Sequence, residues 1–295
     1  MKQFRYYLTL LSLSLLTISF SSLASTHSLN LTEKQKTKTE KPFHAKTNAK
    51  SWYVSWGYNK DYWSNSDIHI SQPGLGNNFT IHNVSAGDCP GWTSGLFNKS
   101  LMGPQYNIRI GHYLNAAHTW GVELSFDHAK YNTNLYQVAR ISGTINGQPV
   151  NQNQVLTPQY FYYALHNGAN LLMLNVVRRK PLFSFFRSYF QFAALGKLGA
   201  GVMLPHPENT VMGNKVDVGP KNFSNSFGWH HGWWQFGGWS VGAEAGFQLL
   251  FHKTVYVELT DKEDYVTLSH IQVYDGTASQ SMWLNEVIGN VGVMF

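Results

Sequence analysis

Aspartate, histidine and serine stand at alternate positions in the segment SDIHIS, as Asp67, His69 and Ser71, and His82 and Asp88 follow in FTIHNVSAGD. Alternate side chains of an extended strand point to the same side, with roots roughly 6 to 7 Å apart. Nucleophilic catalysis needs a hydroxyl, a base that activates it and a carboxylate that orients the base. The segment therefore indicates either a candidate catalytic site at Asp67, His69 and Ser71 or a polar surface hairpin.

A second group of candidate residues lies in the aromatic segment FGWHHGWWQFGGW, which contains Trp229, His230, His231, Trp233 and Trp234. Adjacent histidines on an extended chain point in opposite directions, so this pair is a poor metal site. We therefore predict no metal and no cofactor. The tryptophans indicate a loop that packs on itself or anchors in lipid headgroups, with recognition of a host or ligand surface as the alternative.

The formal charge of +6 is confined to the first 50 residues, which carry eight Lys and Arg against two Glu. The remaining 14 basic and 14 acidic side chains, of 22 and 16 in all, make residues 51–295 neutral. Nucleic-acid binding needs basic charge clustered on a folded face, so we predict no nucleic-acid partner. Cys89 is the only cysteine, which excludes an intramolecular disulfide.

The N-terminal region indicates export. Lys2 and Arg5 precede an uncharged apolar stretch, and small residues then stand at the two positions that specify cleavage after Ala24. No later apolar run is long enough for a membrane helix. We predict a cleaved signal peptide over residues 1–24, a disordered Lys-rich leader over residues 25–50 and one β-domain over residues 51–295.

Period-two alternation of apolar and polar residues is the main structural signal. In residues 239–251, for example, Trp239, Val241 and Phe247 share one face and Glu244 lies on the other. We predict eight strands, at residues 51–59, 104–114, 118–130, 166–178, 189–204, 239–251, 254–264 and 281–295. Short or moderate connections, at residues 115–117, 178–188 and 252–253, alternate with long ones, at residues 60–102, 131–165, 205–238 and 265–280.

The polar faces of these segments carry Gly, Ser, Asn, Gln and isolated charges of both signs. Charged residues make up only 13% of the chain, against about 25% in soluble domains, while aromatics reach 15%. This balance favours an all-β transmembrane antiparallel up-and-down β-barrel of about eight strands with four long extracellular loops. The predicted lumen charge network consists of Arg109, Glu123, Asp127, Lys197, Glu244, Glu258, Lys262 and Glu286. The predicted membrane-interface aromatics are Trp120, Trp239 and Trp283.

The C-terminal Phe295, preceded at alternate positions by Val293, Val291 and then Val287, resembles the assembly signal of outer-membrane barrel proteins. This resemblance implies the barrel assembly machinery as a transient partner. The segments WGYNKDYW, SDIHIS, FDHAKY, TING and HNGAN resemble an uncharacterised family of bacterial outer-membrane barrels, with a layout similar to OmpA-domain, OmpX and lipid A-modifying barrels. The resemblance implies the Gram-negative cell outer membrane as the location and names no activity.

Our leading hypothesis is a non-enzymatic outer-membrane barrel with a structural or surface-interaction role, because a barrel of eight strands has a lumen filled by side chains. Its partners would be outer-membrane lipid and lipopolysaccharide, with host or ligand contacts through the loops. One alternative is a lipid-modifying enzyme, an acyl hydrolase or acyltransferase. The region LSHIQVYDG, however, lacks the His-x-Ser of the lipid A deacylases, since Ser269 directly precedes His270. The third hypothesis is a narrow channel.

Overall fold

The computed structural model describes residues 51–89, 104–186, 188–219, 227–229 and 232–295. The predicted signal peptide (1–24) and leader (25–50) lie outside the described residues, and so do His230 and His231. Among the residues described, no helix has the length and apolar character that a membrane span requires.

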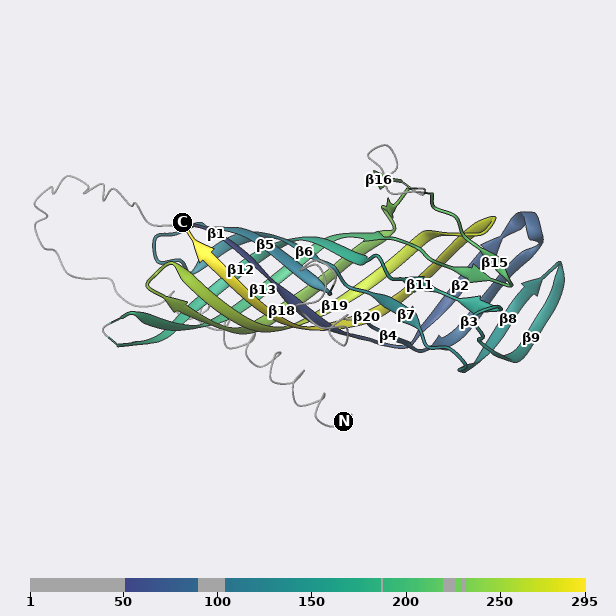
Figure 1. Cartoon of the computed structure of the whole chain (residues 1–295), viewed down its shortest axis with the longest axis horizontal. Helices are drawn as coiled ribbons and strands as arrows, with labels where there is room; N and C mark the ends of the chain where they lie inside the picture. Colours follow the sequence, from purple (N-terminus) through teal and green to yellow (C-terminus); the bar gives the residue numbers. More distant parts are fainter. Residues whose placement is uncertain (1–50, 90–103, 187, 220–226, 230–231) are drawn as a thin grey trace, which may run out of the picture.

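Eight antiparallel strands form a closed ring, as predicted (Figure 1). They are β1 (Trp52–Trp63), β5 (Tyr106–Tyr113), β6 (Trp120–Asp127), β12 (Ala169–Phe185), β13 (Phe190–Pro205), β18 (Gly238–Phe251), β19 (Val255–Val273) and β20 (Gly276–Met294). Each strand pairs with the next one in this order. The ring closes where β1 pairs with β20, from Tyr53 opposite Met294 to Trp63 opposite Leu284. Closure removes the unpaired edges of the barrel strands.

The alternation of the sequence places apolar residues outside the ring and charged residues inside it. Trp239, Val241 and Phe247 are 49%, 47% and 38% exposed, whereas Glu244 and Lys197 are 3% and 2% exposed. A soluble β-sandwich would show the opposite arrangement, with its apolar face in the core. The predicted fold class is therefore confirmed.

Two predicted connections are wrong because strands continue through them. The segment 178–188 is mostly strand, since β12 runs to Phe185 past an irregular register at Pro181. The long connection predicted at 265–280 is also strand, because β19 runs to Val273 and β20 begins at Gly276. A register shift between Leu268 and Ile271 breaks the alternation there. Three long connections remain, and all three lie at one end of the barrel. We call this end the long-connection end and the opposite end the short-turn end.

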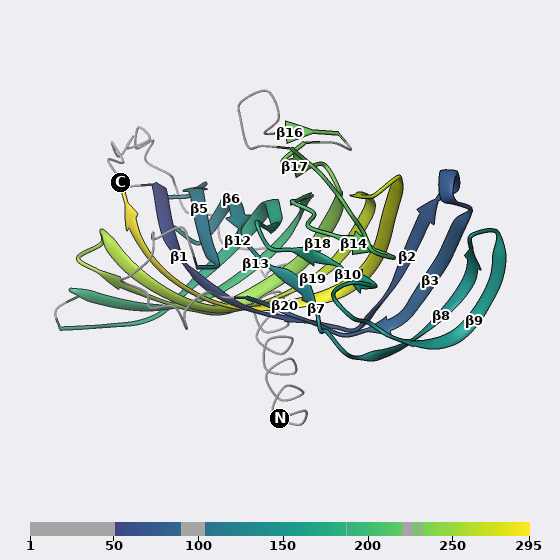
Figure 2. The same ribbon diagram turned by 45° about the vertical axis from the view of Figure 1, so that its right-hand side comes forward.

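Two of the long connections contribute a sheet that extends the barrel wall. Its strands are β2 (Ser66–Gln72), β3 (Asn77–Val84), β8 (Val138–Ile145) and β9 (Gln148–Val155). β2 pairs with the end of β20, with His69 opposite Ser279, and the order continues through β3 and β8 to β9. We call β2, β3, β8 and β9 the extension sheet (Figure 2). The 3-10 turn η1 (Pro73–Leu75) joins β2 to β3.

Shorter strands of the connections form three small sheets. One contains β4 (Ala86–Gly87), β7 (Tyr131–Thr133) and β11 (Ala164–Leu165); the second contains β10 (Phe161–Tyr162), β14 (Thr210–Val211) and β15 (Asn214–Lys215); the third contains β16 (Phe227–Gly228) and β17 (Trp234–Gln235). Tyr131 and Phe161 from these strands are buried together with Ile70 of β2 and Leu268 of β19. The connections therefore supply part of the apolar core at the long-connection end.

The interior has three layers along the barrel axis. A large apolar core fills the long-connection end, behind the extension sheet. The middle of the lumen contains the buried charges. A small cluster of Tyr53, Tyr113, Leu250, Tyr256 and Met294 fills the short-turn end.

The polarity of both faces inverts along a single strand, β20. In its C-terminal half, Val287 and Val291 face outward while Glu286 and Asn290 are buried. In its N-terminal half, Met282 and Ala278 belong to the apolar core, and the outward positions are Ser279 and Ser281. Trp283 lies at the boundary and is 55% exposed. The outer face of β20 is thus apolar along its C-terminal half and polar along its N-terminal half.

Gly292 of β20 leaves room for a ring of the short-turn cluster. A Cβ atom at this position would collide with the ring of Tyr256, whereas a Cβ atom at Gly289 would meet no atom within 4 Å. We expect Gly292→Ala to lower the free energy of unfolding by about 1–3 kcal/mol, the usual cost of overpacking. The measurement is the unfolding midpoint of the folded protein, followed as the shift in gel mobility on heating. Gly289→Ala on the same strand is the control and should leave the midpoint unchanged or slightly raised; equal midpoints for the two variants would contradict the packing.

Candidate functional site

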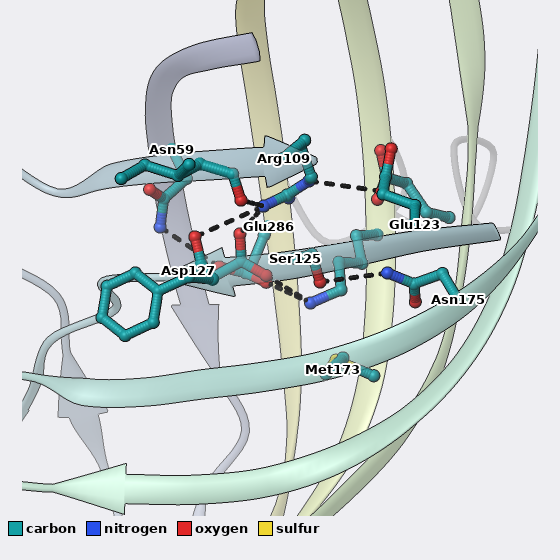
Figure 3. A network of polar contacts seen from close by, with 12 residues as sticks. Asn59, Arg109, Glu123, Ser125, Asp127, Met173, Asn175 and Glu286 are labelled. Atoms are coloured by element: carbon teal, nitrogen blue, oxygen red, sulfur yellow. Dashed lines mark hydrogen bonds and ion pairs between the residues drawn. The ribbon is translucent and has the colours of Figure 1, made fainter. Parts of the chain in front are cut away.

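Ion pairs inside the lumen link side chains from different strands of the ring. Lys197 of β13 contacts Glu123 of β6 at 3.0 Å and Glu244 of β18 at 3.1 Å. Arg109 of β5 pairs with Asp127 and lies 3.7 Å from Glu123 (Figure 3). The structure places all eight residues of the predicted lumen network inside the barrel, each at most 8% exposed.

Lys262 is the centre with the most carboxylate contacts in this network. Its Nζ lies 2.9 Å from Asp127, 2.6 Å from Asp264 and 3.0 Å from Glu286. Glu286 also accepts a hydrogen bond from Asn59 at 3.1 Å (Figure 3). Because the buried charges bond to each other and to amides, the geometry is that of a structural network.

Sequence reasoning missed three members of the interior network. Asp264 lies two residues after Lys262, and Asp61 lies two residues after Asn59, so both side chains face inward. Arg179 is also buried and lies where a turn was predicted. Arg179 donates to Gln248 and Gln191, both at 2.6 Å. Asp264 already lies on the polar face of the predicted strand 254–264, and continuing the period-two alternation past the predicted strand ends would have found Asp61 and Arg179.

A chain of hydrogen bonds joins Asp67, His82 and Ser142 on the outer face of the extension sheet. Nδ1 of His82 donates to Oδ2 of Asp67 at 2.9 Å. Nε2 of the same ring lies 2.7 Å from Oγ of Ser142. With its proton on Nδ1, the neutral ring can accept the hydroxyl proton at Nε2. A carboxylate, an imidazole and a hydroxyl are therefore arranged in the order that an activated serine requires.

An irregularity in strand pairing brings Asp67 and His82 together. Ser66 lies opposite Val84 but Ile68 lies opposite Ile81, so β3 has one extra residue at this point. The bulge lies at Asn83, whose backbone has a φ of 53°. The backbone N–H of Asn83 donates to Oδ1 of Asp67 at 2.8 Å. Such bulges re-aim side chains. Ser142 is reached diagonally, because His82 lies opposite Arg140, two residues before Ser142 on β8.

The chain of polar groups is accessible, and its carboxyl is ionised at neutral pH. The side chains of His82 and Asp67 are 24% and 58% exposed. Partial burial raises the pKa of the Asp67 carboxyl, but the hydrogen bonds from the Asn83 backbone and the His82 ring outweigh it, so the pKa lies below its ordinary value. Asp67 can therefore hold the His82 ring in one tautomer.

Only some of the predicted catalytic candidates belong to the hydrogen-bonded chain of Asp67, His82 and Ser142. Asp67, His69 and Ser71 share the outer face of β2, as the alternation predicts. Nδ1 of His69, however, lies 3.2 Å from Oγ1 of Thr80, and the histidine that binds Asp67 is His82. Asp88 pairs with Lys60. The sequence contained the carboxylate and the histidine, but Ser142 lies about 60 residues from His82 in another connection.

Aromatic side chains form rows around the outside of the barrel. Trp239, Tyr265 and Trp283 form one row on β18, β19 and β20, with ring centroids 5.9 and 5.3 Å apart. Near the short-turn end, Phe185, Phe190 and Phe251 form another row, with centroids 5.0 and 5.2 Å apart.

Two further predicted surface residues lie near the short-turn end. Trp120 stacks under the guanidinium of Arg178 at 4.8 Å. Phe295 is 61% exposed, and its backbone N–H donates to the carbonyl of Trp52 at 2.9 Å.

The tryptophans of the third long connection make separate contacts. Trp233 lies against His206, with ring centroids 4.0 Å apart, and Nε1 of Trp234 donates to the carbonyl of Asn167 at 3.4 Å. Trp229 is 72% exposed, and its ring lies 5.6 Å from that of Phe236. Within the described ranges, no group of three or more His, Cys, Asp or Glu side chains could hold a metal ion.

Comparison with known proteins gives structural neighbours that are outer-membrane or surface proteins. No family model matches the sequence, and no curated protein matches it. Neisserial surface protein A matches with a TM-score of 0.35 and 8% identity, over 83% of this chain and 97% of its own. The outer membrane protein OprG from Pseudomonas aeruginosa matches with a TM-score of 0.35 and 10% identity, over 83% and 97%. The outer membrane protease OmpT from Escherichia coli matches with a TM-score of 0.31 and 6% identity, over 84% and 98%.

Lys262 is the residue whose loss should affect the barrel most. Lys262→Met would leave Asp127, Asp264 and Glu286 without their common cation, and removing one partner of a buried ion pair costs about 3–5 kcal/mol. We expect a clear fall in the unfolding midpoint in denaturant. Lys215→Met, at an exposed position of β15, is the control and should leave the midpoint unchanged. A Lys262→Met midpoint equal to that of the parent would show that the network contributes little to stability.

Proposed function

We propose that the chain is a barrel of the bacterial outer membrane with a closed lumen, whose extension sheet and long connections form a surface for structural or binding contacts. The observation that carries the proposal is the inversion of polarity along β20. An apolar exterior around a charged interior is favourable only where hydrocarbon surrounds the barrel, and the polar outer face of the extension sheet suits water.

The height of the apolar exterior supports this location. From Trp239 to Phe251, β18 advances about 40 Å, which is about 30 Å along the axis at the usual strand tilt of roughly 40°. Aromatic rows lie near both ends of this stretch. Bilayer hydrocarbon is about 30 Å thick, and aromatic girdles flank the apolar band of outer-membrane barrels. Trp239, Trp283 and Trp120 would then lie at the two membrane interfaces.

The same location defines the partners. The exposed aromatic and aliphatic side chains would contact outer-membrane lipid, and the extension sheet would stand among lipopolysaccharide headgroups or reach host or ligand surfaces. Phe295, exposed at the end of β20, would engage the barrel assembly machinery during insertion. Export would use the predicted signal peptide over residues 1–24.

A filled lumen favours a surface role over transport. The apolar core, the charged layer and the tyrosine cluster occupy successive levels of the interior. Because each layer is made of buried side chains, ions have no ready path between them. The hydrogen-bonded chain of Asp67, His82 and Ser142 favours an enzymatic role as the second candidate function.

Reaction of introduced cysteines with a water-soluble maleimide tests the membrane location. The side chains of Leu259 on β19 and Val138 on β8 are 64% and 65% exposed, so cysteines at the two positions would react at equal rates if both faced water. In outer-membrane vesicles, with Cys89→Ser as background, we expect Leu259→Cys to react about tenfold or more slowly than Val138→Cys because lipid covers it. Equal reaction rates of the two variants in vesicles would contradict the proposed membrane location. Unfolded samples are the control, because both cysteines should react at the same rate there.

Conductance in planar bilayers tests the closed lumen. We expect no discrete current steps from the folded protein, because three layers of buried side chains fill the interior. A porin measured in the same bilayers is the positive control. Reproducible steps in the presence of this protein would favour the channel hypothesis instead.

A further inference from the structure

We infer that Asp67, His82 and Ser142 form a serine hydrolase site, with Ser142 as nucleophile, and that it cleaves small carboxylic esters carried by hydroxyl-rich, carbohydrate-like alcohols. The site lies on the outer face of the extension sheet, so the inference does not depend on the barrel being in a membrane. The contacts of 2.9 and 2.7 Å on the two ring nitrogens of His82 meet the distances expected of a nucleophile, a base and its orienting carboxylate.

The backbone around the site holds the three groups in place. Asp67 accepts hydrogen bonds at both of its oxygens, from the Asn83 backbone and from His82. His82 and Ser142 lie on paired strands of one sheet, so their separation is set by the ladder between β3 and β8. Groups on strands are held more rigidly than groups on loops.

Donors for a negatively charged oxygen flank Ser142. Asn151 lies directly opposite Ser142 on β9, and Thr80 lies opposite it on β3. Arg140 precedes Ser142 by two residues on the same face, and its Nη1 lies 3.5 Å from Oδ1 of Asn151. Directly opposite side chains are about 5 Å apart at their Cβ atoms, so amide and guanidinium N–H groups can reach the carbonyl oxygen of an ester at Ser142.

The surroundings of Ser142 indicate the class of substrate. The neighbouring outward positions carry Asn78, Thr80, Thr144, Asn151 and Asn153, all amides or hydroxyls. The apolar side chains next to the site on β3 and β8, Ile81 and Ile141, point the other way into the core, and the exposed Val138 lies four residues before Ser142. An open polar face suits a hydroxyl-rich alcohol with a short acyl group better than a long acyl chain, which requires an apolar groove.

The reaction balances without a cofactor. Oγ of Ser142 attacks the ester carbonyl carbon while Nε2 of His82 takes the hydroxyl proton. The bond between the carbonyl carbon and the alcohol oxygen then breaks, and His82 gives its proton to the leaving alcohol. Water attacks the acyl group on Ser142, its proton passes through His82 to Oγ of Ser142, and a carboxylic acid leaves. Asp67 remains a carboxylate throughout and acts as a positioning residue.

The experiment uses the full folded chain in detergent, with p-nitrophenyl acetate as substrate and a fluorophosphonate as serine-directed probe. We expect turnover and labelling of Ser142, located by peptide mass spectrometry. Ser142→Ala should reduce the rate about a hundredfold or more and abolish labelling. Ser71→Ala, on the same outer face, is the matched control and should retain both.

Further arms test the base, the positioning residue and the substrate class. His82→Ala should abolish turnover, and Asp67→Asn should lower kcat about tenfold or more at unchanged KM, with partial recovery in Asp67→Glu. The inference is overturned if the parent shows no turnover, or if Ser142→Ala keeps the parent's rate while the gel shift shows both folded. Faster hydrolysis of p-nitrophenyl palmitate than of the acetate would overturn the substrate class. Maleimide protection of Leu259→Cys is independent of all these results, so failure of the site and failure of the membrane location are distinguishable.

Discussion

The enclosure of charge within a ring of strands is the constraint on which the remaining structure depends. Lys262 of β19 and Asp127 of β6 stand on opposite walls of the ring and are joined at 2.9 Å. An unpaired charge in this interior would cost several kcal/mol, so each carboxylate and cation must face its partners at a fixed height. That requirement fixes the register of the strands, and the register in turn fixes which residues face outward.

The alternation of the sequence predicted the ring because the direction of a side chain is a local property of a strand. The residue types alone assigned Trp239, Val241 and Phe247 to the outside and Glu244 to the inside. Strand ends were harder, since the irregular register between Leu268 and Ile271 interrupts the pattern of β19 without ending the strand. A break in period two therefore indicates a bulge as readily as a loop.

The candidate site was only partly predictable. Asp67 and His82 belong to one hairpin, but their contact depends on the extra residue at Asn83, a non-glycine residue with positive φ that sequence patterns do not specify. Ser142 joins them because strands of two different connections pair, β3 with β8. Such pairing depends on a core shared at long range, here through Ile81 and Ile141, and has no local signature.

The continuity of β19 and β20 has a mechanical consequence. Their ladder runs without a hinge from Val255 opposite Val293 to Val273 opposite Gly276, interrupted only by one register shift. A pull on the extension sheet along the strand direction would load many backbone hydrogen bonds in parallel, in the shear direction, instead of opening them one after another. The ladder of β19 and β20 would thus transmit tension from the extension sheet to the barrel wall.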